Sequence, residues 1–159
     1  MKTKLLTTLL ICFFANLFTA QTLVKTADIK ISSIAAHLKS KGYEILEQEE
    51  DYIKISNKEK SILFLDIDTG KKYFNLNANI LINKDVSKDK IDKILLEINN
   101  LAMIKADYLP EETAIGFQYY FWIANGFTYE TLEDAIEEFF LYQGDSYALD
   151  KEKIIFNYQ

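Results

Sequence analysis

The chain has 159 residues and a formal net charge of −6, and all 18 of its basic residues are lysine. A nucleic-acid partner favours a basic face that usually carries arginine, so the acidic balance of this chain argues against nucleic acids and against anionic membrane surfaces. One proline and five glycines leave no flexible linker, and we therefore expect a single folded domain.

Residues 1–20 have the pattern of a secretory signal peptide. Two lysines precede an apolar run over 5–18, and small residues lead to Ala20. The run is shorter than the roughly 20 apolar residues that span a bilayer. We predict cleavage near Ala20 and a secreted or periplasmic domain over 21–159 without a membrane span. An uncleaved membrane anchor is the alternative, because Phe18 is bulky for a cleavage site. Cleavage would remove the only cysteine and lower the formal charge to −8.

The first half of the domain is predicted to be a helix followed by four strands. Residues 28–40 repeat apolar side chains at the i, i+3, i+4 and i+7 spacing of an amphipathic helix, and Gly42 follows its predicted end. The period then changes to two, which predicts strands. It is clearest over 73–82, where apolar residues alternate with asparagines, as in an antiparallel strand with one face in the core. The predicted strands cover 43–48, 52–56, 61–68 and 73–82.

The second half is predicted to be helix, strand, strand and helix. A helix over 87–100 begins at Ser87, a residue type favoured at N-caps. Strands over 103–109 and 113–123 follow, joined by a turn at Pro110.

Thr128 is predicted to cap a third helix that ends at Gly144. Residues 145–159 contain apolar side chains and are compatible with either a short helix or a strand. The resulting order is α-β-β-β-β-α-β-β-α, which predicts an α+β domain over 21–159: an antiparallel sheet of about six strands packed on one face by three helices.

The predicted sheet carries large apolar residues on the face that points away from the helices. A sheet packed on one face should be polar on the other, yet several strands break this rule. A contiguous exposed aromatic patch usually marks a binding surface, and Tyr and Trp are enriched among binding anchors. The alternatives are that the C-terminal tail buries this face or that the strand registers differ. The predicted binding residues are Tyr52, Ile62, Phe64, Tyr73, Tyr120 and Trp122.

The segment from Asp66 to Gly70 has three interpretations. Two aspartates two residues apart after an apolar strand occur in phosphotransferases of the haloacid dehalogenase type, although those enzymes need a large parallel sheet. Asp-Thr-Gly also occurs in aspartic proteases, where two carboxylates share a proton. The third interpretation is a hairpin turn, in which Asp and Gly are favoured for backbone reasons. We predict the turn, and a small hydrolase that uses Asp66 and Asp68 remains the alternative.

No other group of residues predicts catalysis, a metal site or a cofactor. His37 is the only histidine, whereas catalytic and metal-bound histidines need partners, so it is predicted to be a surface residue. An acidic flank on the third helix could bind calcium loosely, but it lacks the loop and glycine of dedicated sites, and a solvated face is predicted. The flank consists of Glu133, Asp134, Glu137 and Glu138.

Four segments between Ile29 and Phe140 match one family pattern. They are the helix end over 38–43, the meander to Ile82, the Glu-Ile-Asn-Asn stretch over 97–100 ahead of an Ala-Met-Ile-Lys strand, and the long strand that leads to 126–128. The chain thereby resembles the YbjN-like, type III secretion chaperone-like family. The resemblance implies an α+β sheet packed by helices, often dimeric, that binds protein segments or regulates rather than catalyses.

The sequence therefore predicts an exported, non-enzymatic, protein-binding or regulatory domain that forms a homodimer and uses its aromatic sheet face. A hydrolase that uses Asp66 and Asp68 is one alternative. A carrier that holds a small ligand against the same aromatic face is the other.

Overall fold

The computed structural model describes residues 22–68, 70 and 72–157. The predicted signal peptide over 1–20 lies outside these residues. Within them the elements follow the predicted order α-β-β-β-β-α-β-β-α, preceded by a short 3-10 turn, η1 (Thr26–Asp28). The helices are α2 (Ile31–Ser40), α3 (Lys88–Asn99) and α4 (Tyr129–Leu149).

The strands of the described chain are β1 (Glu44–Gln48), β2 (Tyr52–Ser56), β3 (Ile62–Asp66), β4 (Tyr73–Leu81), β5 (Lys105–Leu109) and β6 (Ala114–Trp122). They form one antiparallel sheet in the order β1-β2-β3-β4-β6-β5. The longest pairing joins β4 to β6, from Tyr73 opposite Trp122 to Leu81 opposite Ala114. The α+β class and the predicted element order are confirmed.

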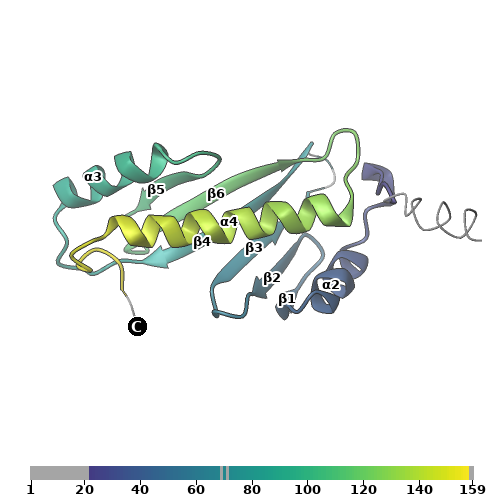
Figure 1. The fold of residues 1–159 in the computed structure, drawn as a ribbon, viewed down its shortest axis with the longest axis horizontal. Coiled ribbons are helices and arrows are strands. Elements are labelled where there is room, and N and C mark those ends of the chain that lie inside the picture. The colour runs from purple at the N-terminus through teal and green to yellow at the C-terminus, as the bar shows by residue number, and fades with distance from the viewer. Residues whose placement is uncertain (1–21, 69, 71, 158–159) are drawn as a thin grey trace, which may run out of the picture.

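The core lies between one face of this sheet and the helices. Alternate strand residues point into it, so that Ile53 and Ile55 of β2 and Phe74 of β4 are fully buried. They belong to the same cluster as Leu38 of α2 and Phe139 of α4. Figure 1 shows α4 running lengthwise across the sheet, with α3 beside β5 and α2 beside β1. We call the opposite side of the sheet the outer face.

Local backbone chemistry decides where several elements begin. Thr128 and Thr131 form a capping box at the start of α4, with the Thr131 N–H donating to Thr128 Oγ1 at 3.2 Å. Ser87 occupies the predicted N-cap of α3, but its side chain makes no capping hydrogen bond. Met103 and Thr113 have positive φ angles of 68° and 52°, so β5 and β6 begin after these residues rather than at them.

The predicted end of the third helix is wrong. Gly144 lies inside α4, which continues to Leu149. A glycine within a helix costs roughly 1 kcal/mol relative to alanine. The neighbouring Gln143 and Ser146 are buried in the protein interior, and we attribute the continuation of the helix to this tertiary packing. None of the helices in the described part of the chain is long and apolar enough to cross a membrane.

The tail after α4 packs into the core instead of forming a regular element. Ile155 and Phe156 are buried, and Phe156 forms a bridge with Ile82 at the end of β4. The Asn157 N–H donates to the carbonyl of Leu81 at 3.0 Å. The tail therefore fills the space beside the end of β4, with Ile154 and the residues before it facing α3.

Candidate binding site on the outer sheet face

All the predicted binding residues lie on the outer face, because they alternate along their strands with residues that are buried in the core. Trp122 is 62% exposed, Tyr120 48% and Ile62 40%. The other three are half-buried: Tyr52, Phe64 and Tyr73.

The register divides these residues into two groups. Across β2 and β3, the rings of Tyr52 and Phe64 lie 6.0 Å apart between centroids, and the ammonium group of Lys54 lies 5.0 Å from the Phe64 ring. Across β4 and β6, Tyr73 and Tyr120 meet edge to face at 4.9 Å, and Trp122 is the strand partner of Tyr73. The two groups flank a polar strip.

The polar strip is built around Asp66. Its Oδ2 accepts hydrogen bonds from the side-chain amides of Asn75 at 3.0 Å and Asn77 at 2.9 Å. Asp66 lies opposite Asn75 across β3 and β4, so the register itself brings these groups together. Asn75 Oδ1 is buried and has no hydrogen-bond partner among the described residues. Sequence reasoning placed Asp66 near the end of the strand over 61–68, weighed the segment from Asp66 to Gly70 as a turn or a catalytic pair, and missed this network.

Asp68 lies just beyond β3 and is exposed. Its Oδ1 accepts a hydrogen bond from the Gly70 N–H at 2.8 Å, as an aspartate does in a turn. Thr69 and Lys71, the other residues of the predicted turn, lie outside the described residues. Asp66 and Asp68 nevertheless line one small depression together with Asn75 and the two tyrosines of the second aromatic group. The predicted carboxylate pair and part of the predicted aromatic surface therefore meet at one place.

Tyr52 is held at the other side of the face. Its hydroxyl donates to Glu47 Oε1 at 2.6 Å, and this bond, together with partial burial and nearby carboxylates, raises the pKa of Tyr52 to about 12. The hydroxyl therefore stays protonated and remains a hydrogen-bond donor at neutral pH.

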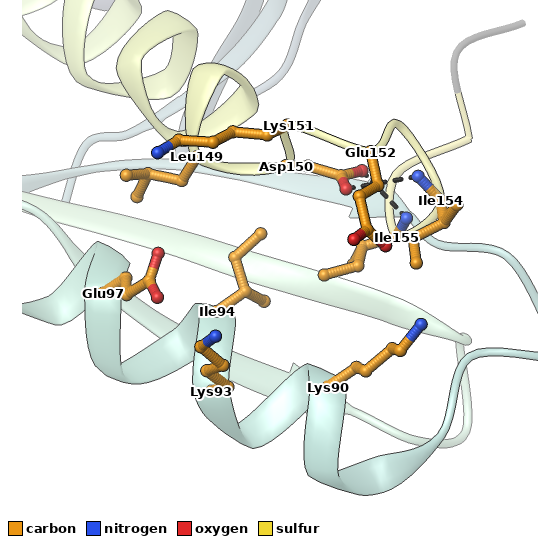
Figure 2. Close-up of a pocket in the computed structure, with 10 residues that line it drawn as sticks. All are labelled: Lys90, Lys93, Ile94, Glu97, Leu149, Asp150, Lys151, Glu152, Ile154 and Ile155. Atoms are coloured by element: carbon orange, nitrogen blue, oxygen red, sulfur yellow. Dashed lines mark hydrogen bonds between the residues drawn. The ribbon is translucent and has the colours of Figure 1, made fainter.

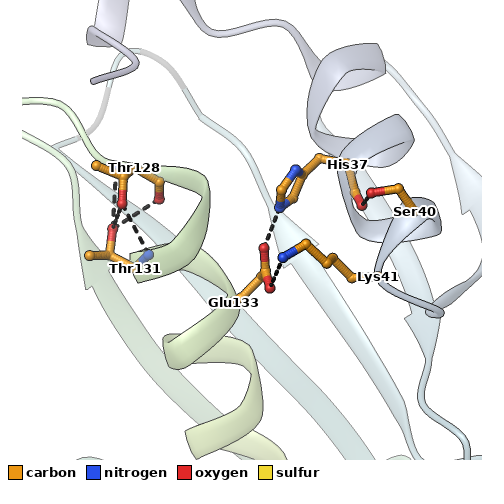
Figure 3. A network of polar contacts seen from close by, with 6 residues as sticks. All are labelled: His37, Ser40, Lys41, Thr128, Thr131 and Glu133. Carbon is orange, nitrogen blue, oxygen red and sulfur yellow. Dashed lines mark hydrogen bonds and ion pairs between the residues drawn. The ribbon is translucent and has the colours of Figure 1, made fainter. Parts of the chain in front are cut away.

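His37 is not the isolated surface residue that the sequence predicted. Figure 3 shows its ring between α2 and α4, where Nε2 contacts Glu133 Oε1 while the ring stacks on Tyr129 at 4.4 Å. Lys41 donates to the other oxygen of Glu133 at 2.9 Å. Burial alone would raise the pKa of Glu133, but the bonds from Lys41 and His37 outweigh it and lower this pKa. The network ties two helices together, and the nearby Ser40 hydroxyl bonds a main-chain carbonyl instead of the ring.

The acidic flank of α4 does not gather into a metal cage. Across residues 22–68, 70 and 72–157, no group of three or more histidine, cysteine, aspartate or glutamate residues is placed to hold a metal ion. Glu133 of this flank accepts a hydrogen bond from Lys41 at the end of α2, and Glu138 accepts one from Tyr119 at 3.3 Å.

A further depression of about 300 Å³ lies between α3 and the C-terminal tail, as Figure 2 shows. Lys90, Lys93 and Glu97 of α3 face Lys151 and Glu152 across it, so its charges are mixed. Asp150, at its edge, accepts backbone hydrogen bonds from the tail. We interpret this region as the seam that attaches the tail to the domain.

The fold is similar to the crystal structure of YbjN from E. coli, described as a proposed transcription regulator. The TM-score is 0.67 at 13% sequence identity, over 86% of this chain and 99% of that chain. At this identity the likeness shows a YbjN-like fold and leaves function to be argued from the residues. Comparisons with protein-family profiles and with curated proteins gave no match.

Proposed function

We propose that this domain is a non-enzymatic, protein-binding module with a regulatory role, and that its partner docks on the outer sheet face. The observation that carries the proposal is the exposure of Trp122, Tyr120 and Ile62 on the side of the sheet that the described helices leave open. Burying one such side chain against a partner contributes about 2 kcal/mol or more. Tryptophan and tyrosine are also the residue types that most often dominate binding energy at interfaces.

The polar strip between the two aromatic groups supports this proposal. Productive interfaces combine apolar anchors with a small number of placed hydrogen-bonding groups. Asp66, Asn75 and Asn77 provide such groups, and their mutual hydrogen bonds hold them in position before a partner arrives. Preorganised groups lose less conformational freedom on binding, which favours affinity.

The likeness to YbjN supports the regulatory part of the proposal. If a chain with this fold acts in regulation, an acidic and arginine-free surface favours contact with a protein rather than with DNA. We therefore propose regulation through protein binding.

Export and self-association complete the proposal. The lysine-led apolar run over 5–18 supports export, with the mature domain over 21–159 acting in the periplasm or outside the cell. A homodimer is proposed because two copies of the same aromatic face could cover each other. Mass spectrometry of the native protein gives its N-terminus, and light scattering of the purified protein gives its mass. A native chain that retains residue 1 would contradict cleavage of the signal peptide, and a strict monomer would contradict the homodimer.

The docking surface is tested with the double variant Y120S/W122S. We expect the variant to remain folded by circular dichroism and to lose self-association and chemical crosslinking to partners in its native compartment by tenfold or more. The matched control is L96S, which removes a side chain that is 65% exposed on α3 instead of on the outer face. Unchanged assembly and crosslinking in Y120S/W122S would refute the docking surface.

One observation favours a second candidate function: Asp66 and Asp68 line the same depression. A small hydrolase that uses this carboxylate pair predicts activity that D68N abolishes while the fold is unchanged. A small-ligand carrier would use the same depression, whose volume of about 140 Å³ is below the roughly 300–1,000 Å³ typical of drug-sized ligands. Direct binding of a small metabolite to the isolated protein, without a protein partner, would favour the carrier.

A further inference from the structure

A depression with a volume of about 260 Å³ lies on the side of the sheet that carries the helices. Three segments border it: the connection from α2 to β1 over 41–43, the turn between β2 and β3 over 57–59, and α4 with Glu137 and Phe140. We call it the helix-side depression. It contains none of the residues of the proposed docking surface, which lies on the outer face.

Local hydrogen bonds hold two walls of the helix-side depression in place. Gly42, with a φ of 94°, reverses the chain at the end of α2, and the Tyr43 N–H donates to the Leu38 carbonyl at 3.2 Å. In the second wall, the Asn57 N–H donates to the Ser61 carbonyl at 3.1 Å, and Asn57 Oδ1 accepts the Ser61 N–H at 2.9 Å. A site with fixed walls loses less conformational freedom when a ligand binds.

Tyr43 and Phe140 supply the apolar part of the lining. Their ring centroids lie 6.4 Å apart and their planes are inclined by 18°, so the two rings are nearly parallel. Both side chains are half-buried and pack against the hydrophobic core, which fixes them from behind. The faces of aromatic rings attract organic cations.

The charges beside the rings leave one carboxylate uncompensated within the lining. Lys41 donates to Glu133, which is not a lining residue, at 2.9 Å, as Figure 3 shows. Lys58 and Glu59 are adjacent on an exposed turn, so their opposite charges offset each other. Glu137 remains as an exposed carboxylate next to the two rings. The lining therefore favours a positive ligand over a negative one.

The surroundings of Glu137 are negative as well. An adjoining shallow depression shares Glu137 and is also lined by Asp134 and Glu138, so three carboxylates of α4 gather there. Burial raises the pKa of Tyr43 to about 12, and the negative charges of Glu137 and Glu133 add to this rise. Carboxylates that oppose ionisation of this hydroxyl also stabilise a cation beside it.

The lining suits a methylated ammonium ion better than a primary one. A primary ammonium group has three N–H donors that need acceptors, whereas a quaternary ammonium ion has none. Asn57 Oδ1 already accepts the Ser61 N–H, and the lining offers ring faces next to an exposed carboxylate. Ring faces of this kind recognise quaternary ammonium groups. The volume is below the roughly 300–1,000 Å³ typical of drug-sized ligands, which favours a cation as small as choline.

We infer that the helix-side depression binds a small, soluble quaternary ammonium ion of the choline type. The ammonium methyl groups lie against the rings of Tyr43 and Phe140, and Glu137 balances the positive charge. The site adds a ligand to the function proposed above and does not depend on it, because the docking surface lies on the other side of the sheet.

The test is an NMR titration of the folded protein with four small molecules. They are choline, its uncharged isostere 3,3-dimethylbutan-1-ol, the primary amine ethanolamine, and phosphocholine, which carries the phosphate of a lipid head group. The backbone amides of Gly42 and Phe140 report on the helix-side depression. The indole N–H of Trp122, the only tryptophan, reports on the outer face.

We expect choline to shift the signals of Gly42 and Phe140 and to leave that of Trp122 unchanged. Choline should bind about tenfold more tightly than either the uncharged isostere or ethanolamine, as a cation held by ring faces and one carboxylate provides. Phosphocholine should bind no more tightly than choline, because its phosphate meets the carboxylates of α4.

Two variants assign the contacts. E137Q removes an exposed charge, so it should leave the fold intact and weaken choline binding about tenfold. The matched control is D145N, which neutralises an exposed carboxylate of the same helix outside the depression and should bind choline like the parent. F140L removes a ring but keeps an apolar side chain, so it should weaken choline binding and leave binding of the uncharged isostere unchanged.

The inference is overturned if choline does not shift Gly42 and Phe140, if the isostere binds as tightly as choline, or if E137Q or F140L binds choline like the parent. A preference for ethanolamine overturns the assignment to a quaternary ion, and tighter binding of phosphocholine overturns the assignment to a ligand without phosphate. Y120S/W122S should bind choline like the parent, so loss of the docking surface and loss of this site are measured separately.

Discussion

Among single residues, Asn99 has a role that its position at a helix end does not reveal. Its amide nitrogen donates to the carbonyl of Ala106 at 2.8 Å, and its Oδ1 accepts from the N–H of the same residue at 2.9 Å. The side chain thereby replaces a neighbouring strand at the edge of β5, where unpaired backbone groups invite pairing with other chains. We expect N99A to lower the free energy of unfolding by about 1–2 kcal/mol, measured by urea denaturation.

The matched control for this prediction is N100A. Asn100 is the next residue and is also exposed, but it takes no part in the two bonds to Ala106. We expect a change of less than about 0.5 kcal/mol for N100A. Equal losses in the two variants would show that the helix end, and not the strand edge, depends on asparagine.

Glu133 makes the contact between α2 and α4 sensitive to acid. Its pKa lies below the ordinary value of 4.5, because Lys41 and His37 bond its charged form against the opposing effect of burial. A carboxylate with a lowered folded-state pKa stabilises the fold above its unfolded-state pKa and loses this contribution as the pH falls through the folded value. We therefore expect E133Q to be less stable than the parent near pH 7 and to show a shallower loss of stability below about pH 4.5. Unfolding measured across this pH range, with D134N as the exposed control, checks the prediction.

Strand alternation predicts which residues of the site share the outer face, but it does not predict which of them are in contact. Alternation correctly placed Tyr120 and Trp122 on the outer face, and the same parity assigns Asp66 to it. The contact of Asp66 with Asn75 depends on the register between β3 and β4, which their connecting turn sets and local sequence does not encode. His37 likewise meets Glu133 across 96 positions in the chain, a separation that periodicity cannot bridge.

Among the elements, long periodic segments were predictable and their ends were not. The alternation over 73–82 matches β4, since many residues agree on one pattern. The starts of β5 and β6 depend instead on the left-handed backbone of Met103 and Thr113, residue types that do not signal this conformation. The third helix was predicted to end at Gly144 because a local glycine signal was given more weight than the packing of the following turn.

The interior position of Gly144 gives a direct prediction for α4. An added Cβ meets no atom within 4 Å, so G144A should stabilise the protein by roughly 0.5–1 kcal/mol through the better helix propensity of alanine. Thermal unfolding measures the effect. The opposite control is G126A: Gly126 has a φ of 85°, and its Cβ would lie 2.7 Å from the carbonyl oxygen of Val24, so this variant should be destabilised. A loss of stability in G144A would mean that the helix needs glycine there.

At the scale of the whole molecule, the tail that follows α4 is part of the hydrophobic core. The buried Ile155 and Phe156 complete a core that begins with residues of α2, so the described chain contributes to one cluster almost from end to end. The sequence showed that the tail contains apolar side chains, but it could not show where the tail packs, because no periodic pattern links it to β4. Two backbone hydrogen bonds fix that position: the Asn157 N–H of the tail donates to the carbonyl of Leu81, and the Asn83 N–H just after β4 donates to the carbonyl of Ile155 in the tail.

Asp150 holds the C-terminal tail in this position. Its carboxylate accepts N–H groups from Ile154 at 3.2 Å, Ile155 at 2.8 Å and Phe156 at 3.1 Å, two of which are drawn in Figure 2. D150A leaves these donors without that acceptor, and we expect it to cost about 3 kcal/mol and to release the tail to limited proteolysis. D150N keeps one acceptor oxygen and should lie between D150A and the parent, whereas the exposed E152A should match the parent. If D150A has the same stability as the parent and its tail resists protease, then the burial of Phe156 alone holds the tail in place.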